Sequence, residues 1–102
     1  LLNQAAHFYF DQLKHHPSAK AAIQYLKQRG LTGQTAKTFE LGFAPPGWDN
    51  LRQHFHGRPE AMGLLEQTGL VIRHESDRVY DRFRHRIMFP IRDRKGQVIG
   101  FG

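Results

Sequence analysis

The sequence predicts an α+β fold in which helices come first and a small antiparallel β-sheet follows. Two observations lead to this class. Apolar residues recur at three- and four-residue spacings up to Thr68, a periodicity typical of helices. After Gly69 the pattern changes to short β-rich runs separated by turn sequences. A chain of 102 residues is one domain's worth at most, so residues 1–102 are expected to form a single subdomain.

Helix starts and stops divide the first part of the chain into five segments. Pro17 ends the first helix, because the residue before a proline avoids helical geometry. Ser18 is expected to cap the second helix, and Gly30 to end it in a left-handed conformation. Asp49 is the expected N-cap of the fourth. The expected helices cover residues 1–16, 18–29, 32–39, 49–55 and 59–68.

The extended segments follow from β-rich runs and from the turn residues between them. Pro45–Gly47 predicts a rigid turn after a buried extended run. Residues 76–81 also resemble a turn. Asp93–Gly96 is expected to close a hairpin, with Gly96 in the left-handed conformation. The expected strands cover residues 41–44, 70–72, 86–91 and 97–101.

Positive charge is concentrated late in the chain. The net charge is +6, from 15 basic and 9 acidic residues. Residues 78–95 hold seven basic and two acidic residues, 7 − 2 = +5, which leaves 8 − 7 = +1 for residues 1–77. Six of the seven basic residues are arginine, the side chain best suited to bidentate phosphate recognition. This distribution favours a polyanionic partner over a merely solvated basic surface, which is the alternative.

Three arginines of this basic segment alternate with other residues between Arg82 and Arg86. If the segment is extended, its three arginines share one face at roughly 7 Å spacing, while Phe83 and His85 take the other. That spacing resembles the phosphate spacing of an extended single strand, and it suits contacts with the backbone rather than with base edges. The nucleic-acid-binding candidates in this segment are Arg82, Arg84 and Arg86. In the alternative interpretation the arginines pair with nearby carboxylates, namely Asp77, Asp81 and Asp93.

Two residues outside the basic segment are further candidates. Trp48 follows Pro45–Gly47 in a predicted loop, where an indole can stack on an unpaired base for about 1–3 kcal/mol. Packing of the indole over the proline rings is the alternative. Arg29 lies in the last turn of the second helix, where a cation complements the helix dipole.

The sequence assigns no catalytic residue and no metal ligand to this chain. There is no Cys, which excludes disulfides and Cys-based zinc sites within these residues. The His15–His16 and His54/His56 spacings do not match a helical zinc pair. There is no D-x-D motif for magnesium and no glycine-rich loop followed by Lys. No apolar run approaches the roughly 20 residues that span a membrane.

Three blocks of the sequence resemble a known family. The run Tyr80–Asp93, followed by Gly96–Gly102, closely resembles the basic motif of bacterial DnaG-type primases. Leu41–Asp49 and Tyr25–Leu31 resemble two further blocks of that family, in the expected order. The resemblance implies the N-terminal, basic subdomain of the primase RNA-polymerase domain. The intact family enzyme is a nucleotidyltransferase that makes RNA primers on single-stranded template DNA in DNA replication.

The resemblance also implies roles for particular residues and partners. Arg29, Trp48, Arg82 and Arg84 match positions associated with a groove that tracks the template, and Arg86 matches the same basic block. The resemblance implies magnesium in a Toprim subdomain after Gly102 and zinc in a domain before Leu1, so this fragment alone is expected to bind no cofactor and to be inactive. The implied partners are the template strand, the Toprim subdomain and, through other domains, the replicative helicase, in the bacterial cytoplasm.

Two alternatives of other classes stay open at the level of the sequence. The chain could be an independent nucleic-acid-binding module without polymerase activity. It could also be a protein-docking domain whose basic segment meets an acidic partner.

Overall fold

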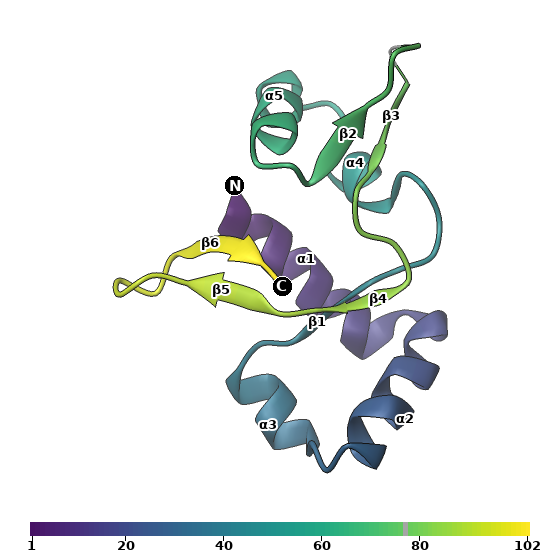
Figure 1. The fold of residues 1–102 in the computed structure, drawn as a ribbon, viewed down its shortest axis with the longest axis vertical. Coiled ribbons are helices and arrows are strands. Elements are labelled where there is room, and N and C mark those ends of the chain that lie inside the picture. Colours follow the sequence, from purple (N-terminus) through teal and green to yellow (C-terminus); the bar gives the residue numbers. More distant parts are fainter. Residues whose placement is uncertain (77) are drawn as a thin grey trace.

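The computed structural model describes residues 1–76 and 78–102, so Asp77 lies outside the described residues. Its class is α+β, as predicted (Figure 1). The helices are α1 (Leu2–His15), the 3-10 helix η1 (Pro17–Ala19), α2 (Lys20–Gln28), α3 (Gly33–Thr38), α4 (Asn50–His54) and α5 (Pro59–Gln67). The strands are β1 (Gly42–Ala44), β2 (Val71–Arg73), β3 (Val79–Asp81), β4 (Arg86–Met88), β5 (Pro90–Arg92) and β6 (Val98–Phe101).

The strands pair antiparallel in three separate two-stranded sheets, β1–β4, β2–β3 and β5–β6. Figure 1 shows α1 near the middle of the molecule, crossed by β1 and β4. Helices α2 and α3 lie at one end, and α4, α5 and the β2–β3 hairpin lie at the other. The β5–β6 hairpin projects to the side. No helix in the described part of the chain is long and apolar enough to cross a membrane.

Helix α1 is the element shared by both parts of the core. Its buried face includes Tyr9, which packs with Leu51 and Leu65 of α4 and α5. One turn further along, Leu13 packs with Leu26 of α2 and with Phe43 of β1. One face of a single helix therefore supports both ends of the molecule, because buried side chains recur along it at three- and four-residue spacings.

Strand β1 crosses α1 at a distance that only glycine permits. A Cβ atom added at Gly42 would lie 2.6 Å from the Tyr9 Cβ and 2.8 Å from the Tyr9 carbonyl carbon. Contacts this short do not occur between real atoms, so any side chain at Gly42 would push the strand away from the helix.

The predicted helix stops are confirmed, whereas the predicted Ser18 cap is wrong and the predicted Asp49 cap is right in position only. Gly30 and Gly69 both have positive φ angles, 83° and 77°. The Leu31 N–H donates to the Leu26 carbonyl, as a Schellman stop requires. Ser18 is not an N-cap. Instead, the His16 ring accepts the Ser18 N–H at 3.0 Å, because a 3-10 turn begins at Pro17.

Asp49 is the N-cap residue of α4, as predicted, but its side chain makes no cap hydrogen bond to the helix. The carboxylate of Asp81 does so from β3. Its Oδ2 accepts the Leu51 N–H at 2.7 Å and its Oδ1 accepts the Arg52 N–H at 3.1 Å. The Asp81 side chain is buried, so this charge-assisted cap joins a helix and a strand that are 29 and 30 residues apart in sequence.

The strand predictions hold except near the basic segment. The predicted hairpin turn at Asp93–Gly96 is confirmed, with Gly96 at φ 83°. Residues 79–81 form strand β3 rather than a turn, because they pair with β2. The expected run 86–91 is divided at Phe89 into β4 and β5.

We expect Asp81→Asn to destabilise the fold. An amide accepts through only one oxygen, so it would leave one buried N–H of α4 facing an N–H₂ group. The expected loss in free energy of unfolding is roughly 1–3 kcal/mol, measured by chemical denaturation. The control Asp49→Asn should change stability by less than about 0.5 kcal/mol. An equal loss in both variants would contradict the assignment of Asp81 as the cap.

The difference in stability between wild type and Asp81→Asn should also depend on pH. Burial raises the pKa of Asp81, and the Leu51 and Arg52 N–H groups counter part of that rise. A carboxyl with a higher pKa when folded binds more protons in the folded state, so its stabilising contribution declines as the pH rises through the raised value. The stability difference between wild type and Asp81→Asn should therefore be largest in acid and shrink toward neutral pH. The opposite trend would show that the pKa is lowered by folding.

Gly42→Ala should also destabilise the chain, by roughly 1–3 kcal/mol, because the strand must move off α1. Gly33→Ala is the matched control. A Cβ at Gly33 meets nothing within 4 Å, and alanine restricts the unfolded chain, so that variant should be neutral or slightly stabilised. Thermal unfolding of both variants distinguishes these outcomes. Similar midpoints for the two would refute the close approach.

Candidate nucleic-acid interface

The basic segment 78–95 does not form one continuous strip. It begins directly before β3 at one end of the molecule, passes through β4 and ends at the tip of the β5–β6 hairpin (Figure 1). Its seven basic residues consequently occupy three places. They are Arg78 and Arg84 beside Trp48, Arg82 and Arg86 beside Phe83, and Arg92, Arg94 and Lys95 on the β5–β6 hairpin.

The first place is the Trp48 cluster, which consists of Trp48, Arg78, Tyr80 and Arg84. The Trp48 and Tyr80 rings meet edge to face, with centroids 5.4 Å apart and planes at 80°. The Arg84 guanidinium carbon lies 4.0 Å from the Trp48 ring centroid, and that of Arg78 lies 5.7 Å away. The indole is 53% exposed, so a cation–π stack is presented at the surface.

Main-chain hydrogen bonds hold the Trp48 cluster in place. The Asp81 N–H donates to the Trp48 carbonyl at 2.7 Å, which joins β3 to the loop before α4. The Arg84 side chain donates to the Asp81 carbonyl at 2.8 Å, which directs its guanidinium toward the indole. The side chain of Asp81 caps α4 at the same time. Asp81 thus holds the Trp48 loop, helix α4 and the Arg84 side chain in place.

The second place is the Phe83 cluster, in which Arg82 and Arg86 flank the Phe83 ring. Their guanidinium carbons lie 5.7 Å and 5.2 Å from the ring centroid, and both arginines are exposed. The Arg82 N–H donates to the Leu70 carbonyl at 2.9 Å, which anchors the segment to the start of β2.

The predicted alternation, with Arg82, Arg84 and Arg86 on one face, is wrong. Strand β3 ends at Asp81, and His85 adopts a left-handed conformation with φ 51°. This turn breaks the two-residue period, so Arg84 lies beside Trp48 while its two neighbours flank Phe83.

The alternative pairing of the arginines with Asp81 and Asp93 is not found among the described residues, and the pairing with Asp77 lies outside them. Asp81 accepts from α4, and Asp93 accepts the N–H groups of Lys95 and Gln97 in its own turn. Arg92 pairs with Glu40 and also donates to the Gly96 carbonyl. Among residues 1–76 and 78–102, the arginines of the Trp48 and Phe83 clusters have no ion pair. Those arginines are Arg78, Arg82, Arg84 and Arg86.

Arg29 is not brought together with the other candidates. It is the C-cap of α2, and its guanidinium lies 5.0 Å from the Tyr25 ring centroid. Helix α2 lies at the opposite end of the molecule from β2 and β3 (Figure 1). A strand that touched both Arg29 and the Trp48 cluster would therefore run along most of the long dimension, which is 42 Å.

Arg78 and Tyr80 were not among the predicted binding residues. Tyr80 opens the block that resembles primases, and Arg78 lies two residues before it. Tyr80 lies in β3 and Arg78 directly precedes that strand, and both side chains meet Trp48 from a distant loop. Alternation within 78–81 was the available signal, but that stretch was expected to be a turn. The described residues contain no group of three or more His, Asp or Glu side chains that could hold a metal ion.

Comparison with known proteins places these features in a family. The sequence profile of the family described as "DNA primase catalytic core, N-terminal domain" matches residues 8–102. The DNA primase of Pseudomonas aeruginosa is 52% identical over 103 residues, which cover 100% of this chain and 16% of that protein. The DNA primase of Escherichia coli K12 is 48% identical over 94 residues, 92% of this chain and 16% of that protein. The chain therefore spans about a sixth of the length of the curated relatives it matches.

Solved structures show the same similarity in three dimensions. A structure described as the DnaG primase catalytic domain bound to ssDNA has a TM-score of 0.93 at 46% identity, over 99% of this chain and 32% of that one. A DNA primase domain from Pseudomonas aeruginosa has a TM-score of 0.91 at 51% identity, over 98% of this chain and 32% of that one. The chain belongs to the family of the N-terminal domain of the DNA primase catalytic core.

Proposed function

We propose that this chain binds single-stranded template DNA and guides it during RNA primer synthesis, as the N-terminal basic subdomain of a bacterial DNA primase. The observation that carries the proposal is the exposed Trp48–Arg84 stack, which combines an aromatic face with a guanidinium that has no carboxylate partner among the described residues. The related catalytic domain that was solved bound to ssDNA supports the same assignment.

The proposed mechanism is positioning. Guanidiniums of the Trp48 and Phe83 clusters hold phosphates, because arginine donates in the planar geometry that phosphate oxygens accept. The indole of Trp48 offers its face to an unpaired base, a contact that tolerates any sequence because every base has a π-face. Contacts of these two kinds fix the path of the strand and leave its base edges free for pairing with incoming nucleotides.

The proposal assigns the chemistry to other parts of the same enzyme. Magnesium would be held by a Toprim subdomain and zinc by a separate zinc-binding domain, and the replicative helicase would contact further domains. The DNA-directed RNA polymerase reaction would then take place in the bacterial cytoplasm, at the replication fork. Residues 1–102 would supply one wall of the channel along which the template reaches the metal site.

We expect two kinds of substitution to weaken binding differently. Each arginine removed in Arg82→Ala and Arg84→Ala should reduce the slope of log affinity against log salt by about 0.7, because fewer counterions are released. Trp48→Ala should weaken binding by about 1–3 kcal/mol without changing that slope. Fluorescence anisotropy of a labelled oligo(dT) over a salt series measures both quantities.

Arg58→Ala is the matched control for these variants, because it removes one exposed guanidinium that pairs with Glu60 and lies over the Phe55 ring, and that belongs to neither cluster. It should change affinity and slope far less than Arg84→Ala does. An equal effect of Arg58→Ala, or unchanged binding in Trp48→Ala together with the arginine double variant, would refute the assignment. Circular dichroism of each variant checks that the fold is retained.

The chain by itself should synthesise no RNA primer on single-stranded DNA with magnesium and nucleoside triphosphates. The intact protein that carries this sequence serves as the positive control in the same assay, read by gel electrophoresis of radiolabelled product. Magnesium-dependent primers made by the purified chain would overturn the proposed division of labour.

A further inference from the structure

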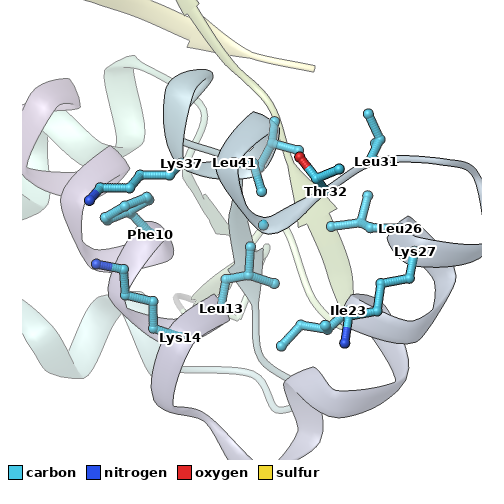
Figure 2. A pocket seen from close by; sticks show the side chains of 12 residues that line it. Phe10, Leu13, Lys14, Ile23, Leu26, Lys27, Leu31, Thr32, Lys37 and Leu41 are labelled. Atoms are coloured by element: carbon cyan, nitrogen blue, oxygen red, sulfur yellow. The ribbon is translucent and has the colours of Figure 1, made fainter.

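A pocket of about 180 Å³ lies at the end of the molecule formed by α1, α2 and α3 (Figure 2). Its floor is the second part of the core, in which Leu13, Leu26 and Leu41 are each less than a tenth exposed. Helices α2 and α3 lie at the opposite end of the molecule from β2 and β3 (Figure 1), and Tyr80 of the Trp48 cluster belongs to β3. The apolar side chains that line it are Phe10, Leu13, Ile23, Leu26, Leu31, Ala36 and Leu41.

The pocket has the size of one large apolar side chain. An apolar protein cavity of about 150 Å³ binds benzene, which corresponds to the ring of a phenylalanine. The pocket is therefore large enough for one phenyl or isobutyl group. Burying such a group removes apolar surface from water on both partners, which is the main source of affinity in small docking sites.

Three lysines surround this apolar floor, one from each helix. They are Lys14 of α1, Lys27 of α2 and Lys37 of α3. Figure 2 shows the amines of Lys14 and Lys37 on either side of Phe10, and Lys27 beside Ile23. The Lys14 ammonium lies 4.4 Å from the Phe10 ring centroid.

No carboxylate balances these lysines. The lining contains neither Asp nor Glu, and none of the three lysines forms an ion pair within residues 1–76 and 78–102. An apolar hollow within a ring of uncompensated cations is complementary to an apolar group flanked by anions.

A nucleotide fits this description less well than a peptide does. Its base would enter the pocket with polar edges that need hydrogen-bond partners. The only uncharged polar side chain in the lining is that of Thr32, whose hydroxyl already accepts the Thr35 N–H at 3.1 Å and contacts the Thr35 hydroxyl at 3.0 Å. Unpaired base edges would carry a desolvation cost that a phenyl or isobutyl group does not.

We propose that this lysine-rimmed pocket is a docking site for an acidic peptide segment of a partner protein, with one Phe or Leu side chain inserted between flanking carboxylates. Charge complementarity favours this occupant, because its carboxylates would pair with lysines that have no carboxylate in the pocket lining. The site is separate from the proposed template surface, so an acidic partner and the DNA strand can bind at the same time.

The test uses the intact protein that carries this sequence and a fluorescein-labelled peptide with one phenylalanine between aspartates. Anisotropy should show saturable binding that weakens with salt. The same peptide with serine in place of phenylalanine should bind at least about tenfold more weakly. In the protein, Lys27→Glu plus Lys37→Glu should weaken binding at least about tenfold, whereas Lys20→Glu, an exposed position of α2 outside the pocket, should change it less than about twofold.

A second variant tests the apolar part alone. Ala36→Leu fills the pocket and leaves all three lysines in place, so it should weaken the peptide while leaving oligo(dT) binding unchanged. Equal affinity for the phenylalanine and serine peptides, or an equal effect of Lys20→Glu, would overturn the proposal. Oligo(dT) binding that falls as much as peptide binding in the Lys27→Glu plus Lys37→Glu variant would overturn it in favour of a nucleic-acid site.

Discussion

The carboxylate of Asp81 is the interaction on which the arrangement of this chain depends. It accepts two main-chain N–H groups at the start of α4, while its own N–H donates to the Trp48 carbonyl. A buried anion is costly unless its oxygens are satisfied, and here the helix N-terminus supplies both donors. Because the same residue ends β3, the position of the following arginines is set by a helix that lies about 30 residues earlier in the sequence.

A second constraint is the close crossing of β1 over α1. Gly42 lets the strand lie against the Tyr9 main chain, and β4 then pairs with β1 in antiparallel register. Phe43 and Met88 can therefore be buried on the two sides of this crossing, Phe43 with Leu13 and Met88 with Tyr9. The arrangement gives a small chain two core regions around one helix, so the packing of α1 stabilises both ends of the molecule.

The arrangement of the basic residues bears on the kind of binding proposed. A regular strand would offer equally spaced guanidiniums, but the chain turns at His85 and distributes them between two aromatic rings. Trp48 then presents cations and an exposed aromatic ring together, whereas Phe83 is partly buried against the core and holds its two arginines at the surface. Such a surface suits an unpaired strand, whose phosphates and bases are both accessible, better than a duplex whose bases are stacked inside. The lysine-rimmed pocket differs in kind, since its cations surround a concave apolar floor rather than a ring edge.

The sequence by itself determined the α+β class, the extents of most helices and the glycine stops at Gly30 and Gly69, because these depend on local periodicity and on φ angles that only certain residues adopt easily. It also determined the concentration of charge in 78–95 and the resemblance to primases. Only the tertiary structure decided that the side chain of Asp81 rather than that of Asp49 caps α4, and that Trp48 meets Arg84 and Tyr80. Those outcomes depend on contacts between residues far apart in the chain. A distant buried carboxylate can cap a helix, and the sequence around the start of that helix does not indicate it.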